Sequence, residues 1–139
     1  MLVFYLKKEK EDTYIKKMLS VIFKCRDTEV RELLSDGDSL VKFENRPLDN
    51  ISEFCVELII YIHGKDRLSD INLSNNYFLG CKISEYINED LIVHYENGDA
   101  YQCILIKENR FFLVEEVDQD SPGINLRKGN KAEIWFSTN

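Results

Sequence analysis

Residues 91–118, LIVHYENGDAYQCILIKENRFFLVEEVD, constrain the fold more than any other part of the sequence. Apolar-rich runs are interrupted twice by short polar pairs, Asn97-Gly98 and Glu108-Asn109. Asn-Gly between apolar runs is the strongest local signal for a β-hairpin, because both central residues of a type I′ turn have positive φ. The stretch therefore predicts a meander of three antiparallel strands, which the rest of the chain has to cover.

Two-residue turns at both positions fix the register of this meander. On one face they form the cross-strand pairs Glu96–Asp99, His94–Tyr101, Ile92–Cys103, Tyr101–Glu116 and Asp99–Asp118. The other face gathers the side chains of Leu91, Val93, Tyr95, Ala100, Ile104, Ile106, Phe111 and Leu113. This apolar face needs a cover that removes it from water. The first face is apolar only at its far end, where a partial cover is expected over Ile92, Cys103, Leu105, Phe112 and Val114.

The expected cover of the apolar face is a helix over Ile51–His63. Its apolar residues recur at the spacing of one helix face, at Ile51, Phe54, Cys55, Leu58, Ile59 and Ile62. Asn50 is a favoured N-cap residue, and Glu53 three positions later completes a variant of the capping box. Gly64 follows the last apolar position, where glycine commonly ends a helix.

The remaining segments predict an α+β fold, a single domain over residues 1–139 with helices packed on one face of an antiparallel sheet. A helix with Asp12 or Thr13 as its N-cap is expected, because one helical stripe is apolar: Ile15, Met18, Leu19 and Ile22. Asp27–Ser35 predicts a second, shorter helix, unless the two form one helix bent near Cys25.

Several shorter segments are expected to add strands and turns. Leu2–Leu6 predicts an edge strand protected by the lysines that follow it. The other expected strands are Ser39–Phe43, which ends before Arg46-Pro47, a strand start at Tyr77–Leu79 with a bend at Gly80, and a closing strand at Ile134–Phe136. Ser84–Asn88 predicts a single helical turn, and residues 65–76 are polar and turn-rich.

Acidic residues concentrate in the middle of the chain. Residues 36–120 hold eighteen Asp or Glu against seven Lys or Arg, a net of −11, whereas the segments on either side each carry a net of +2. A block of that charge repels phosphate backbones and attracts basic proteins. Nucleic-acid binding is therefore not expected. The apolar runs are too short to span a bilayer or to form a secretory signal, so a protein with no membrane attachment, acting in the cytoplasm, is expected.

The four cysteines, at 25, 55, 81 and 103, form no CxxC pair, which disfavours zinc. Buried free thiols in a reducing compartment are expected instead. No phosphate-binding loop or nucleophile elbow is present, so neither a cofactor nor an enzymatic activity is expected. The pair His94 and Cys103 is the one candidate for cysteine chemistry, in a pocket between helix and sheet.

The end of the meander next to the Asn97 turn gathers one aromatic and four acidic residues. We call this group the acidic corner: Glu96, Asp99, Tyr101, Glu116 and Asp118. Like charges directly opposite each other destabilise a sheet, so the pairs that they form have no folding rationale. A cationic partner surface with Tyr101 as an aromatic contact accounts for them. A solvated sheet end and a bound calcium or magnesium ion are the alternatives.

In size, acidity and Asn/Ile/Lys-rich composition, the chain resembles bacterial immunity proteins of contact-dependent and other polymorphic toxin systems. The resemblance implies a cytoplasmic antidote that binds a cognate, basic, nuclease-like toxin domain, and it transfers no residue roles. The expected function is therefore an inhibitor that binds such a partner through the acidic corner. A phage or mobile-element anti-defence protein, and a small-ligand module or enzyme near His94 and Cys103, are the alternative hypotheses.

Overall fold

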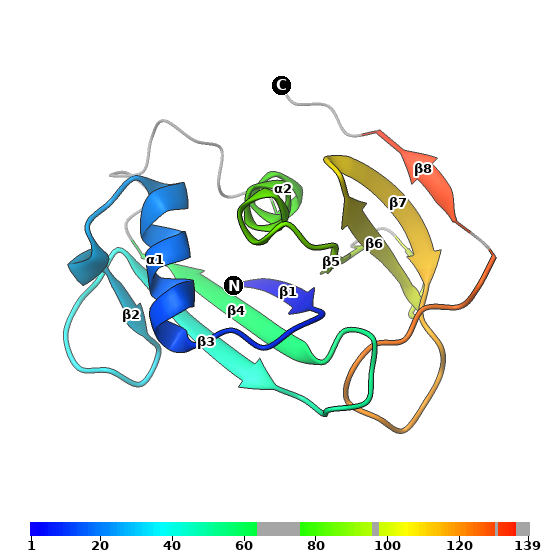
Figure 1. Cartoon of the computed structure of the whole chain (residues 1–139), viewed down its shortest axis with the longest axis horizontal. Coiled ribbons are helices and arrows are strands. Elements are labelled where there is room, and N and C mark those ends of the chain that lie inside the picture. The colour runs from blue at the N-terminus through cyan, green and yellow to red at the C-terminus, as the bar shows by residue number, and fades with distance from the viewer. Residues whose placement is uncertain (64–75, 96–97, 130, 136–139) are drawn as a thin grey trace.

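The structure, a computed structural model, describes residues 1–63, 76–95, 98–129 and 131–135. These residues form one eight-stranded sheet, two α-helices and a 3₁₀ helix (Figure 1). The strands are β1 (Leu2–Leu6), β2 (Val30–Glu32), β3 (Val41–Pro47), β4 (Val56–Ile62), β5 (Leu91–His94), β6 (Gln102–Lys107), β7 (Arg110–Glu115) and β8 (Ala132–Ile134). The helices are α1 (Asp12–Phe23), η1 (Asp27–Glu29) and α2 (Asn76–Ile87). The predicted α+β class is confirmed.

The strands are ordered β2-β3-β4-β1-β5-β6-β7-β8, with β2–β3 parallel and the other neighbours antiparallel. β1 lies in the middle, where Phe4 pairs with Leu58 of β4 and with Val93 of β5. The predicted edge position is therefore wrong. All five residues of β1 are apolar or aromatic, so both of its faces can be packed, and the lysines simply follow the strand.

The predicted helix over Ile51–His63 is also wrong, because most of this segment is strand β4. Val56, Leu58 and Ile60 are buried and alternate with more accessible residues, which is the period of a strand. The run VELIIYI is rich in β-branched residues, which favour strands. It is apolar on both faces, so its residues also satisfy a helical spacing. The expected helix stop, Gly64, lies outside the described residues.

Helix α1 is confirmed, with its apolar stripe buried. Its N-cap is Glu11, not Asp12 or Thr13, and makes no side-chain cap bond. The Asp12 carboxylate instead accepts a hydrogen bond from Asn45 at 3.1 Å. Lys24 follows the helix with a φ of 54°, so the alternative of one bent helix is wrong. The predicted second helix at Asp27–Ser35 is wrong beyond η1, because Val30 enters the sheet opposite Val41.

The predicted strand start at Tyr77–Leu79 and the predicted isolated turn at Ser84–Asn88 are wrong. Helix α2 spans the first segment and all but the last residue of the second. Its buried residues Leu79, Ile83 and Ile87 are four apart and belong to the core. Figure 1 shows the sheet curving around this helix. Gly80 permits the close approach, since a Cβ there would lie 2.5 Å from Ile106 Cδ1. We call the side of the sheet that α1 and α2 pack against the inner face, and it includes the apolar face of the meander.

The two turns of the meander have different outcomes. Glu108 and Asn109 have φ angles of 51° and 61° and join paired β6 and β7, so the second two-residue turn is confirmed. In the first hairpin, His94 pairs with Cys103 and Ile92 with Leu105, so the predicted register is wrong by two residues. Within the connection, the Gln102 side chain accepts a hydrogen bond from the Asp99 backbone amide at 2.9 Å. A shift by two keeps every side chain on its predicted face.

The closing strand is β8, Ala132–Ile134, two residues earlier than predicted. Trp135 lies beyond it and is 82% exposed. Phe136 and residues 65–75 of the polar segment lie outside the described residues. The strand expected at Ser39–Phe43 is β3, which starts at Val41 and continues through Pro47.

The side of the sheet opposite to the inner face, which we call the outer face, is covered over part of its area, as expected for the far end of the meander. A second buried cluster consists of Phe54, Ile92, Cys103, Leu105, Val114 and Ile124. Its cover comes from the loop before β4 and the segment after β7, whose backbones pair at Phe54 and Ile124. The cover ends there, and the β1–β4 half of the outer face keeps accessible side chains.

Asp49 ties these two covering segments together. Its Oδ1 accepts hydrogen bonds from the Ile51 and Ser52 amides at 3.1 and 2.8 Å. Its Oδ2 accepts from the Ser52 hydroxyl at 2.6 Å and from the Gly123 amide at 3.0 Å. A Cβ at Gly123 would lie 2.7 Å from Asp49 Oδ2, so this contact requires glycine. The hydrogen bonds, first those of Ser52, lower the pKa of Asp49 from 3.8 to about 2.

We expect Asp49→Asn to lower the melting temperature at neutral pH, because the amide replaces a charged acceptor of four hydrogen bonds. A carboxyl group with a lowered pKa stabilises the fold above its unfolded pKa, and this contribution disappears as the pH falls through the folded pKa. The difference between natural protein and variant should therefore shrink from pH 3.8 toward pH 2. Thermal melts across this range measure it, with the exposed Asp38→Asn as the control. A constant difference at all pH values would contradict the assigned role.

Candidate functional site

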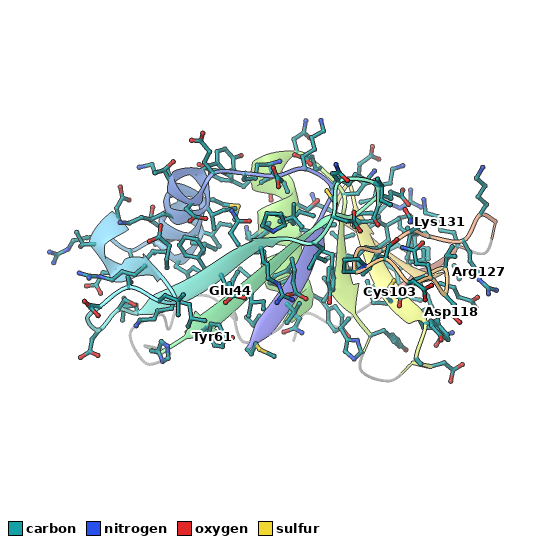
Figure 2. All side chains as sticks on the ribbon, turned by 90° about the horizontal axis from the view of Figure 1, so that it is seen from below. Glu44, Tyr61, Cys103, Asp118, Arg127 and Lys131 are labelled. Atoms are coloured by element: carbon teal, nitrogen blue, oxygen red, sulfur yellow. The ribbon has the colours of Figure 1, made fainter. Side chains whose placement is uncertain are left out.

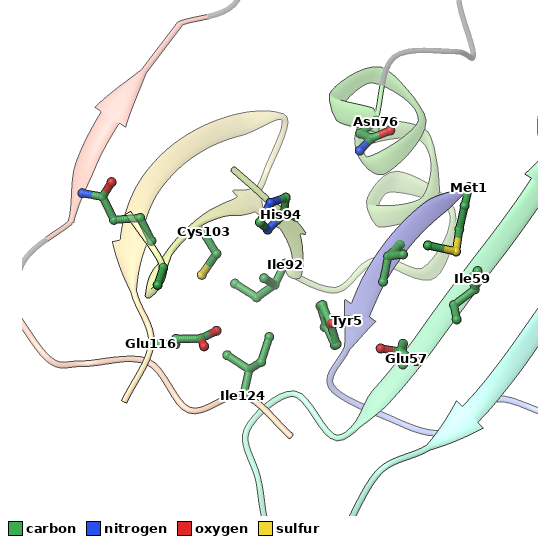
Figure 3. Close-up of a pocket in the computed structure, with 13 residues that line it drawn as sticks. Met1, Tyr5, Glu57, Ile59, Asn76, Ile92, His94, Cys103, Glu116 and Ile124 are labelled. Atoms are coloured by element: carbon green, nitrogen blue, oxygen red, sulfur yellow. The ribbon is translucent and has the colours of Figure 1, made fainter. Parts of the chain in front are cut away.

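A cavity of about 480 Å³ opens on the outer face where the covering segments end (Figure 3). Strands β1, β4, β5 and β6 form its walls, and Ile124 closes one side. Apolar side chains form much of the lining, including Val3, Ile59 and Ile92. The polar side chains of the lining are Tyr5, Glu57, Asn76, His94, Gln102, Cys103 and Glu116. The volume is in the range of about 300–1,000 Å³ typical of ligand pockets.

Two carboxylates enter the cavity from opposite sides. Figure 3 shows Glu57 on β4 and Glu116, just after β7, pointing into the space that contains Tyr5. Glu57 is paired, since its carboxylate lies 2.7 Å from Arg46 and accepts a hydrogen bond from Tyr5. Burial and then the Glu57 charge raise the pKa of Tyr5 to about 12. Tyr5 therefore stays a neutral hydrogen-bond donor.

Glu116 is in a different situation. Burial raises its pKa, and nearby His94 partly opposes that shift. Its backbone amide donates a hydrogen bond to the Tyr101 backbone carbonyl at 2.8 Å. No described residue forms a hydrogen bond or ion pair with its carboxylate. Among the described residues, the Glu116 carboxylate thus lies partly buried at the edge of a cavity without a hydrogen-bond or ion-pair partner.

The structure brings together three members of the acidic corner. Tyr101, Glu116 and Asp118 line a second hollow of about 180 Å³, and Tyr101 is 48% exposed. Glu116 lines both hollows and so joins the corner to the larger cavity. Asp99 is exposed in the preceding loop, and its predicted pairing with Asp118 is not formed among the described strand pairs. Glu96 lies outside the described residues.

His94 and Cys103 are direct cross-strand neighbours, and both line the cavity. Burial, followed by the charge of Glu116, raises the pKa of the Cys103 thiol to about 12. A thiol with so high a pKa forms little thiolate at neutral pH, so it is a poor nucleophile. The pocket expected between helix and sheet is also misplaced, because this cavity lies on the outer face. All four cysteines are free thiols, and Cys103 is the most buried of them.

Sequence reasoning missed Tyr5, Glu57 and Arg46 as site residues. Arg46, Glu57, Tyr5 and Ile92 occupy successive strands in one row across the sheet. That row is hidden when residues 51–63 are taken as a helix and Leu2–Leu6 as an edge strand. The β-branched residues of VELIIYI, which favour a strand over a helix, are the signal that could have revealed it.

Within the described ranges, no three His, Cys, Asp or Glu side chains are arranged to hold a metal ion. The helices of those same ranges are all too short or too polar to cross a bilayer. No family model, curated protein or solved structure matches this chain.

Proposed function

We propose that this protein is an immunity protein or comparable inhibitor, which binds a basic toxin domain in the cytoplasm through the acidic corner and the adjoining cavity. The observation that carries this proposal is the unpaired negative charge at the corner. Five described carboxylates, those of Glu57, Glu89, Asp90, Glu115 and Glu133, have a Lys or Arg within 4 Å. Other described carboxylates, such as those of Asp36 and Glu44, form no ion pair with a described residue, so the corner differs from them in that its carboxylates lie beside an exposed tyrosine and a cavity.

Among the described residues, no ion pair joins Asp99, Glu116 or Asp118 to a basic side chain. Arg127 and Lys131 lie at the same end of the molecule (Figure 2). Arg127 is paired with Glu115, and Lys131 lies over the Phe112 ring. Unpaired carboxylates around an exposed tyrosine favour a partner that brings positive charge.

The test is to capture the partner from the native host and to measure how corner charges affect its association. The double variant Asp99→Lys with Asp118→Lys reverses two exposed charges of the corner and changes no residue that lines the larger cavity. Because attraction between opposite charges accelerates encounter, we expect the association rate at low salt to fall roughly tenfold or more. Surface-immobilised binding kinetics at two salt concentrations measure this effect, which should shrink at high salt.

The matched control is Asp36→Lys with Asp38→Lys, which makes the same charge change in the loop before β3. Figure 2 places Asp118 toward the opposite end of the molecule from Glu44 of β3. If the control slows association as much as the corner variant, net charge and not the corner attracts the partner. If the captured partner is a host defence complex and not a toxin, the anti-defence alternative holds with the same surface.

A second candidate, a small-ligand module, is favoured by the 480 Å³ cavity itself. The raised pKa of Cys103 disfavours the enzymatic form of this alternative. Binding by the isolated protein of a metabolite that blocks partner capture would support the module.

A further inference from the structure

The chemistry of the large cavity restricts what can occupy it. Its lining side chains include two carboxylates and no Lys or Arg. Val3, Ile59 and Ile92 are apolar parts of the same lining. An apolar stem with a positively charged head suits this lining best, because such a head compensates the charge of the partly buried Glu116 carboxylate, which a neutral donor does not, and an anionic head would repel it.

A guanidinium or ammonium group on an alkyl chain has this form. Long basic side chains bury their methylene groups along apolar surface and place the charge at a polar site. Glu116 can accept charge-assisted hydrogen bonds from such a head, whereas Glu57 is already held by Arg46 and Tyr5. The desolvation that raises the pKa of Glu116 is the cost that a bound cation would offset.

We infer that the cavity is an anchor pocket for one arginine or lysine side chain of the basic partner, with Glu116 binding the charged head. This inference rests on the proposed function and gives that function a specific contact. Figure 3 shows Glu116 directed into the cavity beside Ile92 and Ile124, which is the geometry that the inference requires.

The first experiment uses two small probes of nearly equal shape, butylguanidinium, which is charged, and butylurea, which is neutral. Methyl NMR of the purified protein reports binding through Ile59, Ile92 and Ile124, with Ile15 and Ile83 of the inner core as internal references. We expect butylguanidinium to shift the three cavity methyl groups and to bind roughly tenfold more tightly than butylurea. Equal binding of the two probes, or no shift with either, would overturn the inference.

Three variants separate the cavity from the corner. Glu116→Gln keeps the shape of the side chain and removes its charge. It should therefore weaken the binding of butylguanidinium roughly tenfold and leave the binding of butylurea unchanged. Ala100→Trp fills the cavity rim at an exposed position without a charge change and should block both probes. Asp118→Asn, which removes a corner charge outside the cavity, should leave both probes unchanged. Loss of butylguanidinium binding in Asp118→Asn equal to that in Glu116→Gln would contradict the role of Glu116.

The second experiment uses the captured partner to test whether the cation in the cavity is a side chain of that partner or a free small molecule. Ala100→Trp should accelerate dissociation of the partner, because an anchored side chain affects mainly the dissociation rate. If Ala100→Trp blocks butylguanidinium but leaves partner binding unchanged, the cavity holds a free small cation, and the inference is wrong while the proposed function stands. If Asp99→Lys with Asp118→Lys also leaves the partner unaffected, or no partner is captured, the proposed function itself fails.

Discussion

Replacing Phe4 with alanine is expected to lower the free energy of unfolding by about 3–5 kcal/mol, the usual cost of deleting a fully buried aromatic ring. The Phe4 side chain has 0% exposure and lies on the central strand between Leu58 and Val93. It also reaches the point where α2 approaches the sheet, near Gly80. Because small domains have a total stability of about 5–15 kcal/mol, this variant should be close to unfolding at moderate temperature. Urea denaturation followed by circular dichroism measures the loss.

Val3→Ala on the same strand is the control, because Val3 faces the partly open outer face. Its loss should be clearly smaller than that of Phe4→Ala, since Val3 is only half-buried and loses fewer atoms. Similar losses for the two variants would mean that the two faces of β1 are equally covered, contrary to the structure.

Replacing Phe54 with alanine is expected to release the cover of the outer face before the sheet itself unfolds. Phe54 has 0% exposure and belongs to the second buried cluster. Its backbone pairs with Ile124 through hydrogen bonds of 2.9 and 3.0 Å. Loss of the ring should cost about 3–5 kcal/mol in this cluster. Because parts of a protein can open separately, much of that loss should appear as local opening of the two covering segments.

Hydrogen exchange by NMR measures this local opening. The Ile124 amide should exchange much faster in Phe54→Ala, whereas the Ile104 amide in the middle of the sheet should change less. Ile51→Ala is the control, because Ile51 lies in the same loop and is 77% exposed. Equal acceleration at Ile124 and Ile104 would show that the cover and the sheet unfold as one unit. Since Ile124 also lines the cavity, Phe54→Ala should weaken butylguanidinium binding as well.

The parts of the fold that could be predicted are those in which local pattern and tertiary environment agree. Helix α1 has one apolar stripe and one buried face, and the Glu108-Asn109 turn has the residues that its positive φ angles favour. Residues 51–63 show the opposite case. This segment is apolar at helical and at strand spacing, and its neighbours in the sheet, which are distant in sequence, decide between the two.

The site was predictable only as far as the meander reaches. Tyr101, Glu116 and Asp118 came from the register of the second hairpin, which was correct. The other wall of the cavity comes from β1 and β4, and no local signal pairs residues 2–6 with residues 56–60. The register of the first hairpin differs from that of a two-residue turn, and the Asn97-Gly98 signal alone does not reveal this.

The central position of β1 also has a consequence for biosynthesis. β1 is made before both of its neighbours, and it can complete its pairing only after residues 91–93 of β5 have been made. At about 5–20 residues per second, this apolar strand remains without one of its partners for several seconds or longer on the ribosome. The nascent chain therefore carries an apolar strand without its β5 partner until residues 91–93 are available. Chaperones that bind extended apolar segments are expected to contact residues 2–6 during that interval.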